Sequence, residues 1–142
     1  MTRALIICFG LTSAVAGLTA CGDPVVGALP QRPTIDDVQR FVFTPGCTEA
    51  SCHDTATKAG ALDLSSAEVS YRELVEVSAS NPSAKSQNLL RVVSGDPDSS
   101  FLFRKLVSPG PGEGTPMPTV DDRLAAPYLD LVARWIEQGA AR

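Results

Sequence analysis

Residues 47–53, Cys47-Thr48-Glu49-Ala50-Ser51-Cys52-His53, place two cysteines and the only histidine of this 142-residue chain in one short segment. Thr44-Pro45-Gly46 stands directly before it and is typical of a helix end. No apolar period continues through residues 47–64, so we predict an irregular segment there. Leu62 and Leu64, near the end of that segment, are expected to pack onto the core.

Apolar residues at helical spacing flank this segment on both sides. The pattern predicts four short helices: one beginning at Thr34, one capped by Ser65 or Ser66, one over about 98–107, and one beginning near Pro127. The residues predicted to face the core are Ile35, Val38, Phe41 and Val42 in the first helix, Val69, Leu74, Val75 and Val77 in the second, Phe101, Leu102 and Leu106 in the third, and Tyr128, Leu131, Val132, Trp135 and Ile136 in the last.

Three segments between the helices lack this pattern. Residues 78–88 are predicted to form a polar loop, and residues 89–93 are a short apolar run of ambiguous type. Residues 108–123 form a long loop rich in proline and glycine, and loops of this length in compact domains are commonly functional. The acids of this loop are interpreted as solvated; they are Glu113, Asp121 and Asp122.

Together these patterns predict one all-α domain over residues 34–142, with about four short helices, long loops and no strands. Its length allows one modest core. Aromatic residues make up 6% of the chain, so a bound apolar cofactor would help to fill that core.

The first twenty residues have the pattern of a secretory signal peptide. Arg3 precedes a run of apolar and small residues, which is shorter than the roughly 20 apolar residues of a membrane-spanning helix. The run closes on Leu18-Thr19-Ala20-Cys21, which resembles the lipobox of bacterial lipoproteins. In that motif the cysteine is acylated and becomes the first residue after cleavage. We therefore expect a signal peptide over 1–20 and lipid on Cys21; the alternative is a plain signal peptide followed by an incidental cysteine.

Residues 21–33 are predicted to be a flexible tether between the lipid and the domain, because the stretch is rich in glycine and proline and has no period. Gly22 follows the lipid-bearing cysteine. In the best-known sorting rule, aspartate there would retain a lipoprotein in the inner membrane. We therefore expect an exported protein that faces the periplasm and is held at the outer membrane in preference to the inner one.

The mature chain is acidic. Cleavage after residue 20 removes Arg3 and no acid, which leaves 11 basic and 16 acidic residues and a net charge of −5. Such a protein has no electrostatic reason to bind nucleic acid, and we expect no nucleic-acid partner.

Cysteine counting narrows the chemistry of the domain. Of the four cysteines, Cys8 lies in the signal peptide and Cys21 is expected to carry lipid, which leaves Cys47 and Cys52. The space outside the inner membrane is oxidising, so two free thiols are not expected there. A disulfide between the two cysteines or two thioether bonds to haem are the main candidates. A zinc site is less favoured, because Cys52 and His53 are adjacent and no second cysteine pair completes a tetrahedron.

The order Cys-x4-Cys-His favours covalent haem. In c-type cytochromes two cysteines bind the haem vinyl groups, and the histidine after the second cysteine ligates the iron. The common spacer has two residues, whereas this one has four, as in some haem c proteins. Met117, the only methionine outside the signal peptide, lies between two prolines and is a candidate second ligand. The sole histidine and the sole mature methionine thus occupy the two positions that six-coordinate haem requires.

The chain resembles the cytochrome c-like domains of planctomycete and related bacterial secreted proteins from Phe43 to Ala140, about 98 residues. The matching stretches are Phe43-Thr44-Pro45, Cys47 with Cys52-His53, Gly60-Ala61-Leu62-Asp63-Leu64, Val93-Ser94-Gly95-Asp96-Pro97, Phe101-Leu102-Phe103-Arg104-Lys105-Leu106, Met117-Pro118 and Trp135-Ile136-Glu137-Gln138-Gly139-Ala140. The resemblance implies an all-α cytochrome c-like fold, one covalent haem c attached to Cys47 and Cys52, and iron ligation by His53 and Met117.

These observations lead to one expected function and one alternative. The expected function is electron transfer with a redox partner protein at the membrane surface, where the lipid on Cys21 holds the domain. His53 as proximal ligand and Met117 as distal ligand would leave no open iron position, so no enzyme activity is expected. The alternative is a haem-free structural or interaction lipoprotein stapled by a disulfide, in which Met117 and Trp135 serve packing alone.

Overall fold

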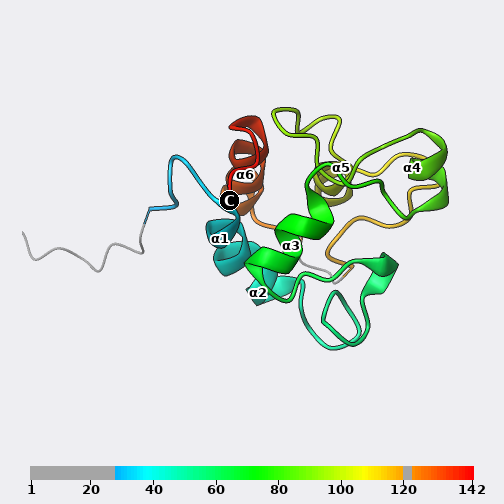
Figure 1. Ribbon diagram of the computed structural model, residues 1–142, viewed down its shortest axis with the longest axis horizontal. Coiled ribbons are helices and arrows are strands. Elements are labelled where there is room, and N and C mark those ends of the chain that lie inside the picture. Colours follow the sequence, from blue (N-terminus) through cyan, green and yellow to red (C-terminus); the bar gives the residue numbers. More distant parts are fainter. Residues whose placement is uncertain (1–27, 120–122) are drawn as a thin grey trace, which may run out of the picture.

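The structure is a computed structural model that describes residues 28–119 and 123–142. Within these ranges the chain is all-α: it contains helices and isolated bridges but no strand. The helical elements are α1 (Ile35–Val38), η1 (Gln39–Phe43), α2 (Thr44–Gly46), η2 (Ala59–Ala61), α3 (Ala67–Leu74), α4 (Pro82–Ser86), α5 (Phe101–Val107) and α6 (Ala126–Glu137). In Figure 1, α6 lies beside α1, and α4 lies at the far side of the domain from both.

The predicted signal peptide and Cys21 lie outside the described residues. The C-terminal part of the predicted tether is described and contacts α6, since Arg134 Nη1 donates to the Pro30 carbonyl at 2.7 Å and Gln138 Nε2 to the Gln31 carbonyl at 3.0 Å. No helix in the described ranges is both long and apolar enough to cross a bilayer.

The first helical stretch runs without a break through α1, η1 and α2. It begins at Thr34, whose backbone N–H donates to Asp37 Oδ2 at 2.9 Å and satisfies one free donor of the first turn. The wide π turn of η1 places an extra residue in the helix. Phe43 is buried in the core, whereas Phe41, predicted to face it, is partly buried and packs against the core cluster.

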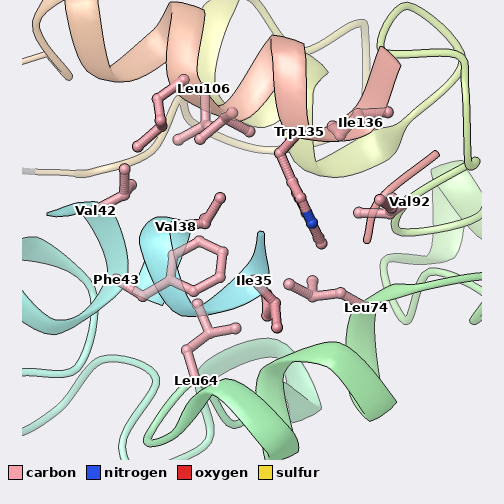
Figure 2. Close-up of a cluster of buried hydrophobic side chains, with 13 residues drawn as sticks. Ile35, Val38, Val42, Phe43, Leu64, Leu74, Val92, Leu106, Trp135 and Ile136 are labelled. Atoms are coloured by element: carbon pink, nitrogen blue, oxygen red, sulfur yellow. The ribbon is translucent and has the colours of Figure 1, made fainter. Parts of the chain in front are cut away.

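The core lies between the first helical stretch, α3 and α6 (Figure 2). Trp135 is fully buried in it, as predicted, and its Nε1 donates to the Ala141 carbonyl at 2.9 Å. Leu64 is buried and Leu62 packs against the core, as expected, while the segment 47–64, predicted to be irregular, contains the short turn η2. Tyr128 is 37% exposed, so the prediction that it faces the core is wrong. The helix begins at Ala126, and its first turn extends beyond the core.

The structure corrects the prediction for residues 78–88 and assigns a conformation to residues 89–93, whose type was ambiguous. The polar stretch 78–88 contains α4, because Asn81 caps it, accepting from Ala84 N–H at 3.0 Å, and Pro82 fits the first turn. The ambiguous run 89–93 is extended and forms isolated bridges with the chain that follows α3.

A buried polar network joins η1 to α3 and to the end of the 47–64 segment. Gln39 Nε2 donates to the Leu64 carbonyl at 2.8 Å, and Gln39 Oε1 accepts from Ser70 Oγ at 2.8 Å. The glutamine therefore satisfies a backbone carbonyl and a hydroxyl that are both out of reach of water.

We expect Gln39→Leu to lower the free energy of unfolding by about 1–3 kcal/mol, because it leaves the Leu64 carbonyl and the Ser70 hydroxyl buried without their partner. Denaturant unfolding followed by circular dichroism measures the change. The control is Gln87→Leu, at an exposed glutamine, which is expected to stay within about 0.5 kcal/mol of wild type. Equal losses in the two variants would contradict a structural role for the network.

Candidate functional site

The backbone of residues 47–53 folds back on itself. Cys52 N–H donates to the Glu49 carbonyl at 2.9 Å, and His53 N–H donates to the Cys47 carbonyl at 3.0 Å. The spacer residues 49–51 are exposed, and Ser51 adopts a left-handed conformation with φ of 79°. The four-residue spacer therefore bulges outward and brings Cys47 next to Cys52 and His53.

His53 is held in a defined orientation by the segment that follows it. Its Nδ1 lies 3.2 Å from the Leu62 carbonyl, and its own carbonyl accepts from Leu64 N–H at 2.8 Å. Because a carbonyl only accepts hydrogen bonds, the Nδ1–H must be the donor in this contact. The neutral imidazole then carries its free lone pair on Nε2, which is the arrangement of a histidine prepared to ligate a metal.

The two cysteines are both partly buried and are free thiols. Cys47 packs against the core, and its Sγ–H contacts the Val42 carbonyl at 3.7 Å. Burial, and secondly the neighbouring Cys52, raises the pKa of Cys47 from 9.0 to about 11. In the described part of the chain, no group of three or more His, Cys, Asp or Glu side chains is placed to hold a metal ion. Two neighbouring thiols of this kind can form covalent bonds at sulfur.

The raised pKa of Cys47 predicts slow alkylation of its thiol in the folded protein. In protein free of covalent modification and kept reduced, alkylation of Cys47 at pH 8 is expected to be about 100-fold slower in the folded state than in denaturant, since two pKa units lower the reactive thiolate fraction by that factor. The folded state also holds this proton more tightly, so its stability falls as pH rises from 9.0 to about 11. Site-resolved mass spectrometry measures the rates, and equal rates in both states would contradict the burial of this thiol.

Met117 is partly buried and packs against the same core cluster as Cys47 and Leu62. Its backbone N–H donates to the Lys105 carbonyl at 2.7 Å, which ties it to the last turn of α5. Cys47 and Met117 thus pack against the same core, whereas Cys52 is not among the residues that contact it.

The loop before Met117 contains a buried acid. Glu113 is 1% exposed, so its interpretation as a solvated acid is wrong. Its carboxylate accepts from Gly110 N–H at 2.7 Å, from Arg104 Nε at 3.3 Å and, in a closer contact, from Arg104 Nη2. Both oxygens therefore have partners, which is how a carboxylate tolerates burial. Asp121 and Asp122 lie outside the described residues.

Lys105 completes the attachment of this loop. Its Nζ donates to the Glu113 carbonyl at 3.0 Å and, at shorter range, to the Thr115 carbonyl. Burial lowers the pKa of Lys105, and the nearby Glu113 acts in the opposite direction. Sequence analysis missed Arg104 and Lys105. The one available signal was a pair of basic residues in the last turn of a helix, directly before a glycine-rich loop with an acid.

An open pocket of about 240 Å³ lies elsewhere on the domain, lined by Ile35, Asp36, Ala67, Glu68, Tyr71 and Arg142. It contains none of the predicted ligands, and its volume is below the roughly 300–1,000 Å³ of typical small-molecule sites. The residues of the 47–53 segment are therefore the stronger candidate for function.

No family model, curated protein or solved structure matches this chain.

Proposed function

We propose that this protein is a lipid-anchored cytochrome c-like electron carrier with one covalent haem c. Cys47 and Cys52 hold the haem through thioether bonds, His53 is the proximal ligand and Met117 the distal one. The observation that supports this proposal most directly is the hydrogen bond of His53 Nδ1 to the Leu62 carbonyl, which leaves Nε2 available directly after Cys52.

Three features of the proposed donor set support haem attachment. The outward bulge of the spacer keeps both thiols close to the imidazole despite the four intervening residues. Met117, Cys47 and Leu62 all pack against the core cluster, as do other partly buried apolar residues, among them Phe41, Leu102, Phe103, Leu124 and Leu129.

When bound, haem supplies a one-electron couple between two iron oxidation states. The Leu62 carbonyl accepts from Nδ1 of His53 and orients the imidazole with Nε2 free to bind the iron. The Met117 thioether is a soft, uncharged ligand of the kind that raises the reduction potential in cytochromes c. With two side chains assigned to the axial positions, no substrate position remains, so the proposed role is electron transfer and not enzymatic catalysis.

The proposed location follows from the N-terminal sequence. Lipid on Cys21 would hold the domain at the periplasmic face of a membrane, with the outer membrane preferred, close to a redox partner protein. Cys21→Ala is expected to abolish incorporation of a labelled fatty acid into the protein, because it removes the acylated thiol. Metabolic labelling followed by immunoprecipitation tests this, and a wild-type protein that takes up no label would contradict the lipid anchor.

The deciding experiment is to express the full chain together with the haem attachment machinery. The expected product stains for haem after denaturation, shows sharp cytochrome absorption bands and gains the mass of one haem. The matched control is Cys47→Ser with Cys52→Ser, which should lose all three signals. A colourless wild-type protein with a disulfide between residues 47 and 52 would overturn the proposal and favour the stapled, haem-free alternative.

A further inference from the structure

The loop over residues 108–119 is attached to α5 by side chains at two adjacent positions. Arg104 binds the buried carboxylate of Glu113, and Lys105 binds the carbonyls of Glu113 and Thr115. We call these three residues, Arg104, Lys105 and Glu113, the loop clamp. The contact nearest to Met117 is made by the same helical turn, whose Lys105 carbonyl accepts the Met117 N–H at 2.7 Å.

The buried carboxylate of this clamp lies outside the hydrophobic core cluster. Glu113 lies in a glycine-rich loop and is 1% exposed, and an exposed acid at this position would avoid the cost of desolvation. Removing either partner of such a pair leaves a buried charge without compensation, so the pair favours one conformation of the loop strongly. The Gly110 N–H on Glu113 adds a local turn to that conformation.

A second element supports the outer side of the loop. Ser83 Oγ of α4 donates to the Pro111 carbonyl at 3.2 Å, and Asn81 Nδ2 donates to the Gly112 carbonyl at 3.3 Å. Gly112 has a φ of +79°, and a Cβ there would lie 3.0 Å from Ser83 Oγ. The loop is thus fixed from α5 on one side and from α4 on the other, directly before Met117.

We propose that the loop clamp consists of positioning residues that hold the Met117 thioether in place as the second iron ligand. This inference rests on the proposed function. A thioether is a weak, uncharged acceptor, so its bond to iron depends on how often the loop presents it correctly. A loop rich in proline and glycine keeps the Met117 sulfur at the iron only if contacts outside the loop fix its conformation. The loop clamp supplies those contacts.

The test compares three variants of the full, haem-loaded chain. Glu113→Gln removes the buried charge, and Lys105→Met removes the two carbonyl contacts while leaving the Arg104–Glu113 pair in place. Asp130→Asn is the control, because it breaks the ion pair of Arg134 with Asp130, whose side chain is 62% exposed, in α6. Circular dichroism establishes which variants are folded.

Two readouts report on Met117 itself. Carbon monoxide must displace the thioether from reduced haem, so its binding rate is expected to rise about tenfold in Glu113→Gln and in Lys105→Met and to stay unchanged in Asp130→Asn. Hydrogen exchange of the Met117 amide, which donates to the Lys105 carbonyl, is expected to accelerate in the same two variants. If Glu113→Gln does not fold, Lys105→Met decides the question.

The outcomes separate this inference from the function on which it rests. A haem-free wild-type protein would overturn the proposed function, and the ligand-positioning role with it. A haem-loaded wild-type protein whose carbon monoxide binding and Met117 exchange are the same in both clamp variants would overturn the clamp alone.

Discussion

Trp135→Ala is expected to lower the free energy of unfolding by about 3–5 kcal/mol, the largest loss of stability for a single substitution in this domain. The side chain is fully buried among residues of the first helical stretch, α3 and α6 (Figure 2), and its Nε1–H would no longer satisfy the Ala141 carbonyl. Domains of this kind have a total stability of about 5–15 kcal/mol, so this one substitution removes a large fraction of the total near the lower end of that range.

The control for this prediction is Tyr128→Ala, at another aromatic residue of α6. Tyr128 is 37% exposed, and its truncation is expected to change the free energy of unfolding by about 0.5 kcal/mol or less. Urea unfolding followed by far-ultraviolet circular dichroism measures both, because this signal does not depend on tryptophan. Similar losses in the two variants would show that the core does not centre on Trp135.

The helices could be predicted where an apolar period coincided with a capping residue. Thr34 and Ser66 begin their helices as expected, and the buried residues of α6 from Leu131 onward follow the predicted face. Helix α4 was missed because its residues are polar and Ala84 alone is buried, so the Asn81-Pro82 start was the one local signal. The π turn in η1 leaves no mark in the sequence, since one widened turn changes the register by less than a residue pattern can resolve.

The proposed ligands could be selected from the sequence, whereas the groups that contact them could not. Adjacency in sequence is enough to bring Cys52 and His53 together, and the flanking prolines draw attention to Met117. The Leu62 carbonyl lies nine residues from His53 across an irregular segment, and its contact depends on backbone geometry. Glu113 looks like any loop acid until the fold places Arg104 beside it. Orienting contacts of this kind arise from tertiary structure, which periodicity cannot report.

Met117→His is expected to lower the reduction potential of the haem-loaded protein by more than about 0.1 V, because axial ligands set haem potentials over a range of roughly 0.8 V and methionine lies at the high end. An imidazole donates more strongly than a thioether and stabilises the oxidised iron. The backbone contact of residue 117 with the Lys105 carbonyl does not involve the side chain and should persist in the variant. Spectroelectrochemical titration measures the midpoint potential.

The matched control is Met117→Leu, which keeps the apolar volume and removes the sulfur. It should leave the haem attached but open one iron position, so that carbon monoxide binds the reduced protein without having to displace a ligand. A lower potential in Met117→His, together with direct carbon monoxide binding in Met117→Leu, would identify residue 117 as an iron ligand and not as a packing residue. If neither substitution moves the potential or the carbon monoxide reactivity, Met117 fills space against the core, and the second ligand must come from another side chain.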